Sequence, residues 1–145
     1  MADITLRPAT EAEASSIKDL IHRVEINPMG LDWRRFVVAV DGSGKMLGCG
    51  QLKPHGSEVI ELASIAVESE FRHQGIARMI IEHLIEQGPR PLYLTCRSRL
   101  GVFYEKWGFR SIEPDEMPPY FRRLSRLAGM MNIFFNDKLL VMKLK

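Results

Sequence analysis

The order of hydrophobic and polar residues predicts that the chain begins with a strand followed by a helix. Apolar and polar residues alternate over Ile4–Pro8, and the run stops at a proline, as expected for a short strand. Thr10 and Glu13 have the spacing of a capping box, which marks the start of a helix. Apolar residues then recur at helical spacing over 14–24, so one face of this helix is expected to be buried.

A β-hairpin is predicted next. Phe36–Val40 is a run of apolar and β-branched residues, 41–44 has the composition of a turn, and Met46–Leu52 resumes an extended pattern. Gly48 and Gly50 weaken the second arm as an ordinary strand, because glycine has no side chain to pack. Their presence predicts a bulge or a close approach of another part of the chain.

The rest of the chain alternates between strands and helices after a loop at Pro54–Ser57. The same signals predict strands at Glu58–Val67, Leu92–Cys96, Phe109–Ile112 and Leu139–Leu144, and helices at Ile76–Gln87, Leu100–Trp107 and Pro118–Met131. Strands in runs with interspersed helices predict an α/β (α+β) protein whose mixed sheet is covered by helices on both faces. No linker or composition shift divides the chain, so a single domain over residues 1–145 is expected.

Composition then excludes several classes of protein. With 46% hydrophobic residues and a net charge of +2, the chain lacks the basic excess expected of a nucleic-acid-binding protein. Its apolar stretches are too short to span a membrane, and its first residues do not resemble a signal peptide. Cys49 and Cys96 are too few for a disulfide scaffold or a metal cluster, and we expect buried thiols. A reduced, cytoplasmic, metal-free domain is therefore predicted.

The segment Ile65–Arg78 carries the most informative chemistry. A buried strand ends, a polar loop follows, and a helix begins at a glycine, Gly75. The first N–H groups of a helix are unpaired and carry a partial positive charge, so this junction can bind an anion such as a pyrophosphate. Arg72 and Arg78 add positive charge nearby. The alternative is an ordinary turn with solvated arginines.

A second segment, Phe103–Phe109, is a short helix that ends at Gly108 and returns as a strand. Together the two segments resemble the GNAT superfamily of acetyl-CoA-dependent N-acetyltransferases. The first matches its Gln/Arg-x-x-Gly-x-Gly/Ala pyrophosphate loop, and the second its Tyr-x-x-x-Gly-Phe segment. The order of elements also matches from Ile4 to Lys145. The resemblance implies the GNAT fold, with a central mixed, mostly antiparallel sheet of about six to seven strands.

The resemblance also implies a site for acetyl-CoA as co-substrate. Backbone groups of residues 65–67 would bind the thioester and pantetheine in a wedge beside the strand Leu92–Cys96, and the polar loop would hold the pyrophosphate. Ser98 stands where many relatives carry an asparagine, and its shorter side chain has less reach. The implied cofactor-binding residues are Ile65, Ala66, Val67, Arg72, His73, Gln74, Gly75, Ile76, Ala77, Arg78, Ser98 and Tyr104.

Glu61 is the candidate general base. An amine must lose a proton before it attacks a thioester, and a carboxylate can accept that proton directly or through water. Strand alternation places Glu61 on one face with Ala63, Ile65 and Val67, where an unpaired acid would be costly to bury. Glu61 also falls where some GNAT relatives place their catalytic glutamate. The alternative is a structural ion pair at the mouth of a cleft.

Tyr104 is the candidate general acid. The sulfur that leaves the acetyl group needs a proton, and a nearby phenol can supply it. The alternative is a core aromatic, a role that the neighbouring Phe103 fits, whereas Tyr104 matches the acid of the family.

The expected activity is therefore direct transfer of an acetyl group from acetyl-CoA to a primary amine in a ternary complex, with a small amine-bearing metabolite as acceptor. Paired arginines next to loops favour an acceptor that also carries an acid group; these are Arg34, Arg35, Arg97, Arg99, Arg122 and Arg123. The alternatives are a protein N-acetyltransferase and a non-catalytic CoA-binding regulatory module. Met130–Phe135 is predicted to lie in the core, although an exposed version would suit a homodimer interface.

Overall fold

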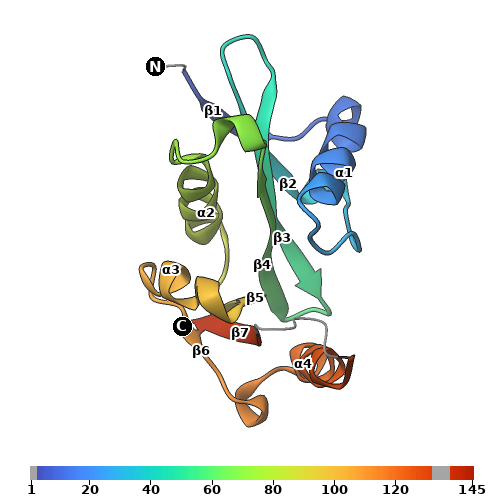
Figure 1. Ribbon diagram of the computed structural model, residues 1–145, viewed down its shortest axis with the longest axis vertical. Coiled ribbons are helices and arrows are strands. Elements are labelled where there is room, and N and C mark those ends of the chain that lie inside the picture. Colours follow the sequence, from blue (N-terminus) through green and yellow to red (C-terminus); the bar gives the residue numbers. More distant parts are fainter. Residues whose placement is uncertain (1–2, 132–137) are drawn as a thin grey trace. The chain divides into compact units, whose positions relative to one another are not determined.

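The computed structural model describes residues 3–131 and 138–145 and contains a seven-stranded sheet with four α-helices (Figure 1). The strands are β1 (Thr5–Pro8), β2 (Phe36–Val40), β3 (Met46–His55), β4 (Val59–Val67), β5 (Leu92–Arg97), β6 (Arg110–Ser111) and β7 (Leu139–Leu144). The helices are α1 (Ala14–Arg23), α2 (Ile76–Gln87), α3 (Gly101–Glu105) and α4 (Pro119–Met131). The predicted elements are thus present in the predicted order.

The sheet is mixed. Its strand order is β1-β2-β3-β4-β5-β7-β6. β4 and β5 pair in parallel, with Glu61 opposite Tyr93, whereas β1 with β2, β2 with β3, β5 with β7 and β6 with β7 pair in antiparallel fashion. The predicted fold class, a mostly antiparallel mixed sheet with helices, is confirmed. The chain forms two compact units, residues 1–53 with 62–88 and residues 54–61 with 89–145.

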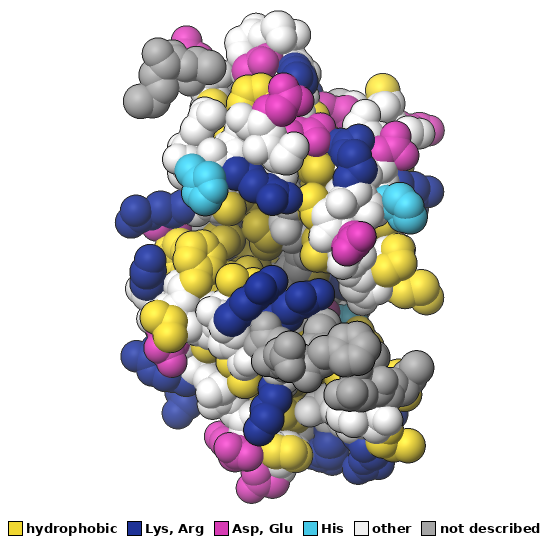
Figure 2. Space-filling view, viewed as in Figure 1, with side chains coloured by type: hydrophobic (Ala, Val, Ile, Leu, Met, Phe, Trp, Pro, Cys, Tyr) yellow, Lys and Arg dark blue, Asp and Glu magenta, His cyan; other side chains and the backbone are white. Residues whose placement is uncertain are grey.

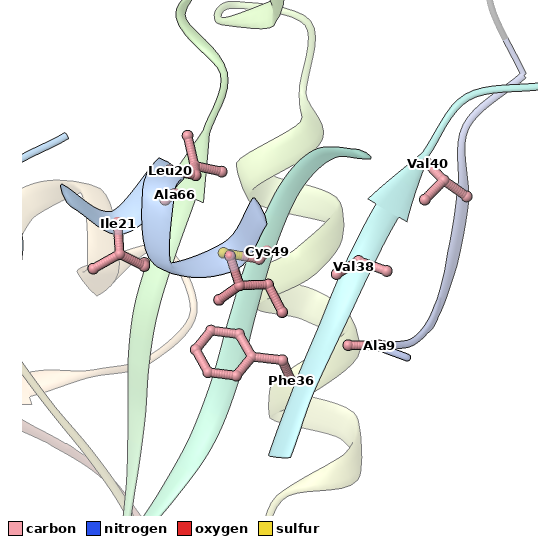
Figure 3. Packing of buried hydrophobic residues seen from close by; sticks show 9 residues of the cluster. Ala9, Leu20, Ile21, Phe36, Val38, Val40, Cys49 and Ala66 are labelled. Atoms are coloured by element: carbon pink, nitrogen blue, oxygen red, sulfur yellow. The ribbon is translucent and has the colours of Figure 1, made fainter. Parts of the chain in front are cut away.

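In the first unit, α1 covers one face of the sheet. The capping box of Thr10 and Glu13 is present at the start of this segment, as predicted. The buried residues of α1 pack on side chains from β2, β3 and β4 (Figure 3); the cluster comprises Ala9, Ile17, Leu20, Ile21, Phe36, Val38, Val40, Cys49 and Ala66. Burying such apolar side chains stabilises the fold by roughly 1.5–3 kcal/mol each.

The opposite face of the same strands is covered by α2 (Figure 1). A Cβ atom at Gly48 would lie 2.9 Å from the carbonyl oxygen of Ala66 and 3.2 Å from Ile80 Cδ1. A Cβ atom at Gly50 would lie 2.7 Å from side-chain atoms of Ile65 and Ile80. The two glycines therefore let α2 and β4 approach β3 closely, which is one of the two outcomes that their presence predicted.

In the second unit, α4 packs on β5 and β7. Its core consists of Tyr93, Met117, Phe121 and Val141, with Phe121 fully buried. Gly101 of α3 lies against Leu140, and a Cβ atom there would be 2.9 Å from Leu140 Cδ1. Both units thus consist of strands with helices packed on them.

Three details differ from the sequence-based expectations. β3 continues through the residues predicted as a loop and ends at His55, because the turn to β4 needs only residues 56–58. α3 is shorter than predicted and ends at Glu105. Met130, predicted in the core, is 78% exposed; the rest of its predicted core segment, from residue 132 to Phe135, lies outside the described residues.

Charges are interspersed over the visible surface. In the view of Figure 2, basic and acidic side chains lie among neutral ones, in agreement with the small net charge. Among the described residues, no helix has the length and apolar character needed to cross a bilayer.

We expect Gly48→Ala to destabilise the protein by about 1–3 kcal/mol, because the new methyl group meets a backbone oxygen that cannot move aside independently. Gly42→Ala is the matched control, since a Cβ atom there would have no heavy atom within 4 Å. Its effect should stay within about 0.5 kcal/mol. Urea unfolding of both variants measures the difference, and equal free energies of unfolding would contradict the close packing.

Candidate active site

The loop between β4 and α2 contains two residues in the left-handed region of the backbone map. His73 has φ 66° and Gly75 has φ 81°. Gly75 is the N-cap of α2, and its carbonyl accepts a hydrogen bond from Met79 N. Positive φ is strained for most residues but accessible to glycine, so this glycine permits the sharp entry into the helix. The loop therefore turns abruptly into an exposed helix N-terminus.

The predicted pyrophosphate-binding side chains lie at the surface of the first unit. Arg72, His73 and Gln74 are exposed, as expected for groups that meet a ligand. Arg78 is also exposed and pairs with Glu82 one helical turn later, with 3.2 Å between Nε and Oε2. The start of the loop is anchored where Glu68 N donates to the carbonyl of Leu47 at 2.8 Å.

β4 is irregular at Ser64, which has φ 59°. Side chains before and after such a residue do not keep a continuous period-two alternation. Strand alternation therefore no longer supports the prediction that Glu61 shares a face with Ile65 and Val67. Ile65 lies next to Gly50 on the side of α2, and Ala66 belongs to the cluster under α1. The direction of Glu61 is set instead by its own partners.

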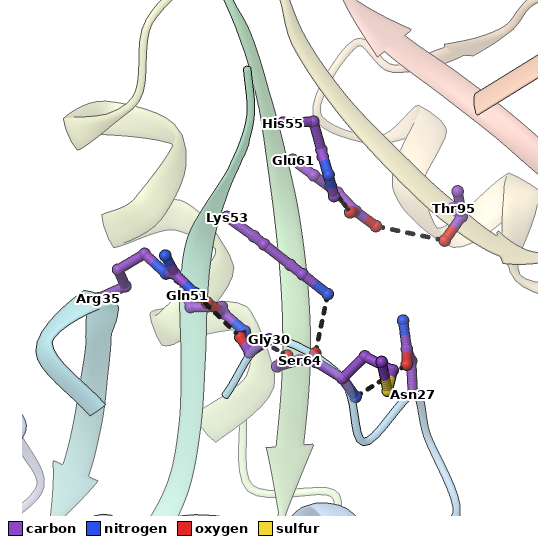
Figure 4. Close-up of polar contacts among 10 residues, drawn as sticks. Asn27, Gly30, Arg35, Gln51, Lys53, His55, Glu61, Ser64 and Thr95 are labelled. Atoms are coloured by element: carbon purple, nitrogen blue, oxygen red, sulfur yellow. Dashed lines mark hydrogen bonds and ion pairs between the residues drawn. The ribbon is translucent and has the colours of Figure 1, made fainter. Parts of the chain in front are cut away.

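Glu61 is buried and is bonded through both carboxylate oxygens (Figure 4). His55 Nε2 lies 2.6 Å from Oε1, and Thr95 Oγ1 donates to Oε2 at 3.4 Å. The side chains of His55 and Glu61 are 11% and 9% exposed. The His55 ring stacks on Tyr120, with 3.7 Å between ring centroids and 17° between planes. This arrangement satisfies a carboxylate that would otherwise be costly to bury.

His55 is a residue that the sequence reasoning missed as part of this site. Residue 55 falls within the predicted loop Pro54–Ser57 and matches neither family motif. The available signal was its spacing: a histidine and a glutamate six residues apart flank a short turn between two extended segments. In a tight hairpin, such positions are close enough for their side chains to interact.

A second polar network holds the segment after α1 (Figure 4). Lys53 Nζ donates to the carbonyl of Met29 at 2.9 Å, and Gln51 Nε2 donates to the carbonyl of Gly30 at 3.1 Å. Arg35 is a second donor to the carbonyl of Gly30, at 3.3 Å. Lys53 and Gln51 are both buried on β3, so they tie an otherwise exposed loop to the sheet.

Tyr104 lies on α3 within an aromatic group. Its ring centroid is 6.2 Å from that of Trp107 and 6.3 Å from that of Phe109. Burial, together with the charge of Cys96 when ionised, raises the pKa of Tyr104 to about 12. The phenol is therefore protonated at neutral pH, which is the state that a proton donor requires.

Ser98 and the two cysteines make contacts within the protein. Ser98 Oγ accepts a hydrogen bond from Lys138 N at 3.2 Å. Cys49 and Cys96 are buried thiols that form no disulfide, as predicted. Burial, with a further contribution from Glu68, raises the pKa of the Cys49 thiol to about 12, so its thiolate is strongly disfavoured. Within the described ranges, no group of three His, Cys, Asp or Glu side chains is placed to hold a metal ion.

The predicted site residues fall into two groups. Residues 65–67 and 72–78 belong to the first compact unit, whereas Glu61, Ser98 and Tyr104 belong to the second. Within the second unit, the structure brings Glu61 together with His55 and Thr95.

Several of the arginines predicted near the acceptor are engaged by the protein itself. Arg34 Nε pairs with Asp32 Oδ1 at 3.0 Å. Arg122 donates to the carbonyl oxygens of Pro114 and Met117 at 3.0 and 2.9 Å. These contacts stabilise turns, so they weaken the prediction that the arginines serve to hold an acidic group of the acceptor.

Comparison with known proteins identifies the family. The sequence of residues 32–111, more than half of the chain, matches the family model of the acetyltransferase (GNAT) domain. The chain belongs to the GNAT acetyltransferase family. The predicted class, an acetyl-CoA-dependent N-acetyltransferase, is confirmed at the level of this family, and acetyl-CoA is the co-substrate that the family uses.

Three proteins are similar to this chain in sequence or in fold. An uncharacterized N-acetyltransferase of Chlorobaculum tepidum is 29% identical over 131 residues, which cover 81% of this chain and 82% of that protein. N-acetylglutamate synthase from Neisseria gonorrhoeae, crystallised with coenzyme A and N-acetyl-glutamate, has a TM-score of 0.75 at 21% identity and covers 100% of this chain. This GNAT chain spans 36% of the length of that synthase. Rv2747 from Mycobacterium tuberculosis, in complex with CoA and NLQ, has a TM-score of 0.72 at 22% identity, with 97% and 98% of the two chains covered.

Proposed function

We propose that this GNAT protein transfers an acetyl group from acetyl-CoA directly to the primary amine of a small metabolite in a ternary complex. The observation that carries the proposal is Glu61, a buried carboxylate bonded to His55 and Thr95 in a family whose reaction consumes a neutral amine. A carboxylate held in place by specific partners can accept a proton directly or through water. The proposed general base is accordingly centred on Glu61.

The proposed acetyl-CoA site uses the residues implied by the family resemblance. Backbone groups of Ile65, Ala66 and Val67 would bind the pantetheine arm. The pyrophosphate would lie at the N-terminus of α2, against N–H groups of residues 72–77 and the charges of Arg72 and Arg78. Support comes from the exposed loop, the sharp turn at Gly75 and the charge at the helix start. Ser98 would add a hydrogen bond to pantetheine.

Tyr104 is proposed to protonate the departing thiolate of CoA. Its phenol stays protonated through the neutral range because its pKa is raised to about 12. A thiol would otherwise leave as an anion, and a positioned donor lowers the barrier by stabilising the charge that develops on sulfur.

Direct attack is favoured over an acyl-cysteine intermediate. Nucleophilic cysteines depend on a lowered pKa, and that of Cys49 is raised to about 12. Cys96 is buried, with its Sγ 3.8 Å from Met142 Sδ. Both thiols also fit a reduced, cytoplasmic setting, which we include in the proposal.

A small acceptor is the proposed substrate class. Its support is the similarity to the N-acetylglutamate synthase, whose crystal structure contains N-acetyl-glutamate, the acetylated form of a small amine-bearing acid. Two alternatives remain part of the test. A protein N-acetyltransferase would modify an N-terminal or lysine amine, and a CoA-binding regulatory module would bind the cofactor without turnover.

A thiol-release assay with acetyl-CoA tests the proposed function. The panel contains glutamate, glutamine, neutral amino acids, spermidine and a peptide with a free N-terminus. We expect turnover with at least one small metabolite at a higher kcat/KM than with the peptide. Preference for the peptide would establish a protein acceptor, and calorimetric binding of acetyl-CoA without any turnover would establish a regulatory module.

Gly75→Asn tests the phosphate loop. Asparagine tolerates a positive φ, and a Cβ atom at Gly75 has no heavy atom within 4 Å, so the fold should be kept. Its side chain would stand where the pyrophosphate approaches the backbone, so the dissociation constant of acetyl-CoA should rise at least ~10-fold in calorimetry. Gly44→Asn is the matched control, because Gly44 has φ 87° and equally open surroundings in a turn. Equal affinity in both variants would reject the loop as the pyrophosphate site.

Tyr104→Phe tests the general acid. We expect kcat to fall by ~10²–10⁴-fold with little change in acetyl-CoA affinity, because the proton is transferred in the transition state. Since the pKa of Tyr104 is raised to about 12, the wild-type rate should show no fall due to this group in the mildly alkaline range. An unchanged kcat in a folded Tyr104→Phe variant would assign Tyr104 to the aromatic core alone.

A further inference from the structure

We propose that His55 accepts the proton of the acceptor amine, and that Glu61 is a positioning residue that orients the His55 ring and stabilises its cation. The inference rests on the proposed function and replaces a lone carboxylate base with a histidine–glutamate pair. It assigns a role to a residue at the end of β3 that the family motifs do not include.

The hydrogen bonds of Glu61 argue against this carboxylate as the atom that takes the proton. Oε1 is bonded to His55 Nε2 at 2.6 Å, and Oε2 accepts from Thr95 Oγ1 at 3.4 Å. Each oxygen is thus already engaged by a neighbouring group inside a side chain that is 9% exposed. A buried carboxylate whose two oxygens each bind a neighbouring side chain serves better to fix a partner than to meet a substrate.

The same bond defines the tautomer of His55. An ionised carboxylate can only accept hydrogen bonds, so Nε2 carries the proton in the neutral ring and donates it to Glu61. Nδ1 is then an acceptor with a free lone pair. Nδ1 has no hydrogen-bond partner among the described residues, and in that part of the chain no side-chain N or O atom is both buried and unsatisfied. Nδ1 is therefore reachable from solvent.

The surroundings of the ring favour this role. Tyr120 of α4 stacks on it and fixes its plane, and Phe121 meets it edge-on with 5.6 Å between centroids. The pKa of Tyr120 is raised by burial and by the charge of Glu61, so this phenol stays protonated and does not compete for the proton. From β5, Tyr93 and Thr95 face the pair, and Lys143 of β7 lies over the Tyr93 ring.

The reaction step balances with these groups. The ammonium form of the acceptor transfers one proton to His55 Nδ1, directly or through one water, and becomes a neutral amine. The imidazolium stays paired with the Glu61 carboxylate through Nε2–H. The amine nitrogen attacks the thioester carbon, the C–N bond forms and the C–S bond breaks. The leaving CoA thiolate takes the proton of Tyr104. The Tyr104 phenolate then takes a proton from the acylated nitrogen. His55 releases its proton to solvent.

The experiment compares His55→Gln with Glu61→Gln in kcat against pH. A glutamine at position 55 can still donate to Glu61 but cannot take up a proton, so we expect kcat at neutral pH to fall by ~10²–10⁴-fold and the rising limb of the profile to vanish. Glu61→Gln should keep that limb and lower kcat, because the imidazolium loses the carboxylate that orients and stabilises it. His22→Gln, an exposed histidine on α1, is the matched control and should match wild type. Imidazole added to His55→Ala should restore part of the rate.

The outcomes separate the inference from the proposed function. If kcat rises with pH in His55→Gln as it does in the wild type, and this rise is absent in Glu61→Gln, then Glu61 itself is the base. That result would overturn the inference, while the proposed acetyl transfer would stand. A limb that survives in both variants would also overturn it. Nitrogen-15 NMR of labelled histidine decides the matter without turnover: a neutral His55 ring with the proton on Nε2 supports the inference, and a proton on Nδ1 overturns it.

Discussion

A carboxylate buried in a sheet must find partners inside the protein, and this requirement organises the candidate active site around Glu61. Water cannot stabilise the charge there, so each oxygen needs a donor from a neighbouring element. β3 supplies His55, β5 supplies Thr95, and α4 supplies the ring of Tyr120 that holds His55 in plane. Removing one partner would leave a buried charge unsatisfied, which costs more than the hydrogen bond contributes. Glu61 therefore links β3 to β5, and the His55 ring extends this link to α4.

The other compact unit depends on a different constraint, the close packing of α2 against β3 and β4. Gly48 and Gly50 remove two side chains from the face that α2 covers, so Ile65, Ile76, Ile80 and Leu84 fill that space. The packing also determines where α2 begins, because Ile76 is buried one residue after the left-handed Gly75. The exposed helix N-terminus proposed to bind pyrophosphate thus has its position set by apolar contacts beneath it.

Polar side chains on β3 perform a third task in the segment that follows α1. Met29 and Gly30 are exposed and contain no helix or strand, yet their carbonyl oxygens accept bonds from Lys53, Gln51 and Arg35. Burying the donors strengthens these bonds, because the surroundings of low dielectric screen them less than water does. β3 therefore contributes apolar packing, loop anchoring and the histidine of the proposed proton-accepting pair along a single strand.

The order of strands and helices and the family of this protein can be predicted from the sequence alone, because the local pattern of residues determines local structure. Alternation and helical spacing identified every strand and α-helix in order, and two motifs pointed to the family that the comparisons confirmed. Glu61 was identified as a candidate because an acid within an apolar strand is conspicuous.

The partners of Glu61 depended on tertiary structure. The composition of Pro54–Ser57 predicts a loop, and the spacing of His55 and Glu61 is only a weak signal; the structure shows that β3 continues past Pro54 and that a short turn brings residue 55 back to residue 61. Thr95 and Tyr120 come from elements far along the chain, and long-range pairing places them beside the carboxylate. The irregularity at Ser64 likewise breaks an alternation that sequence spacing assumes to be continuous. Sequence spacing thus identified the carboxylate, whereas its contacts, and so its chemistry, follow from the packing of elements that are distant in sequence.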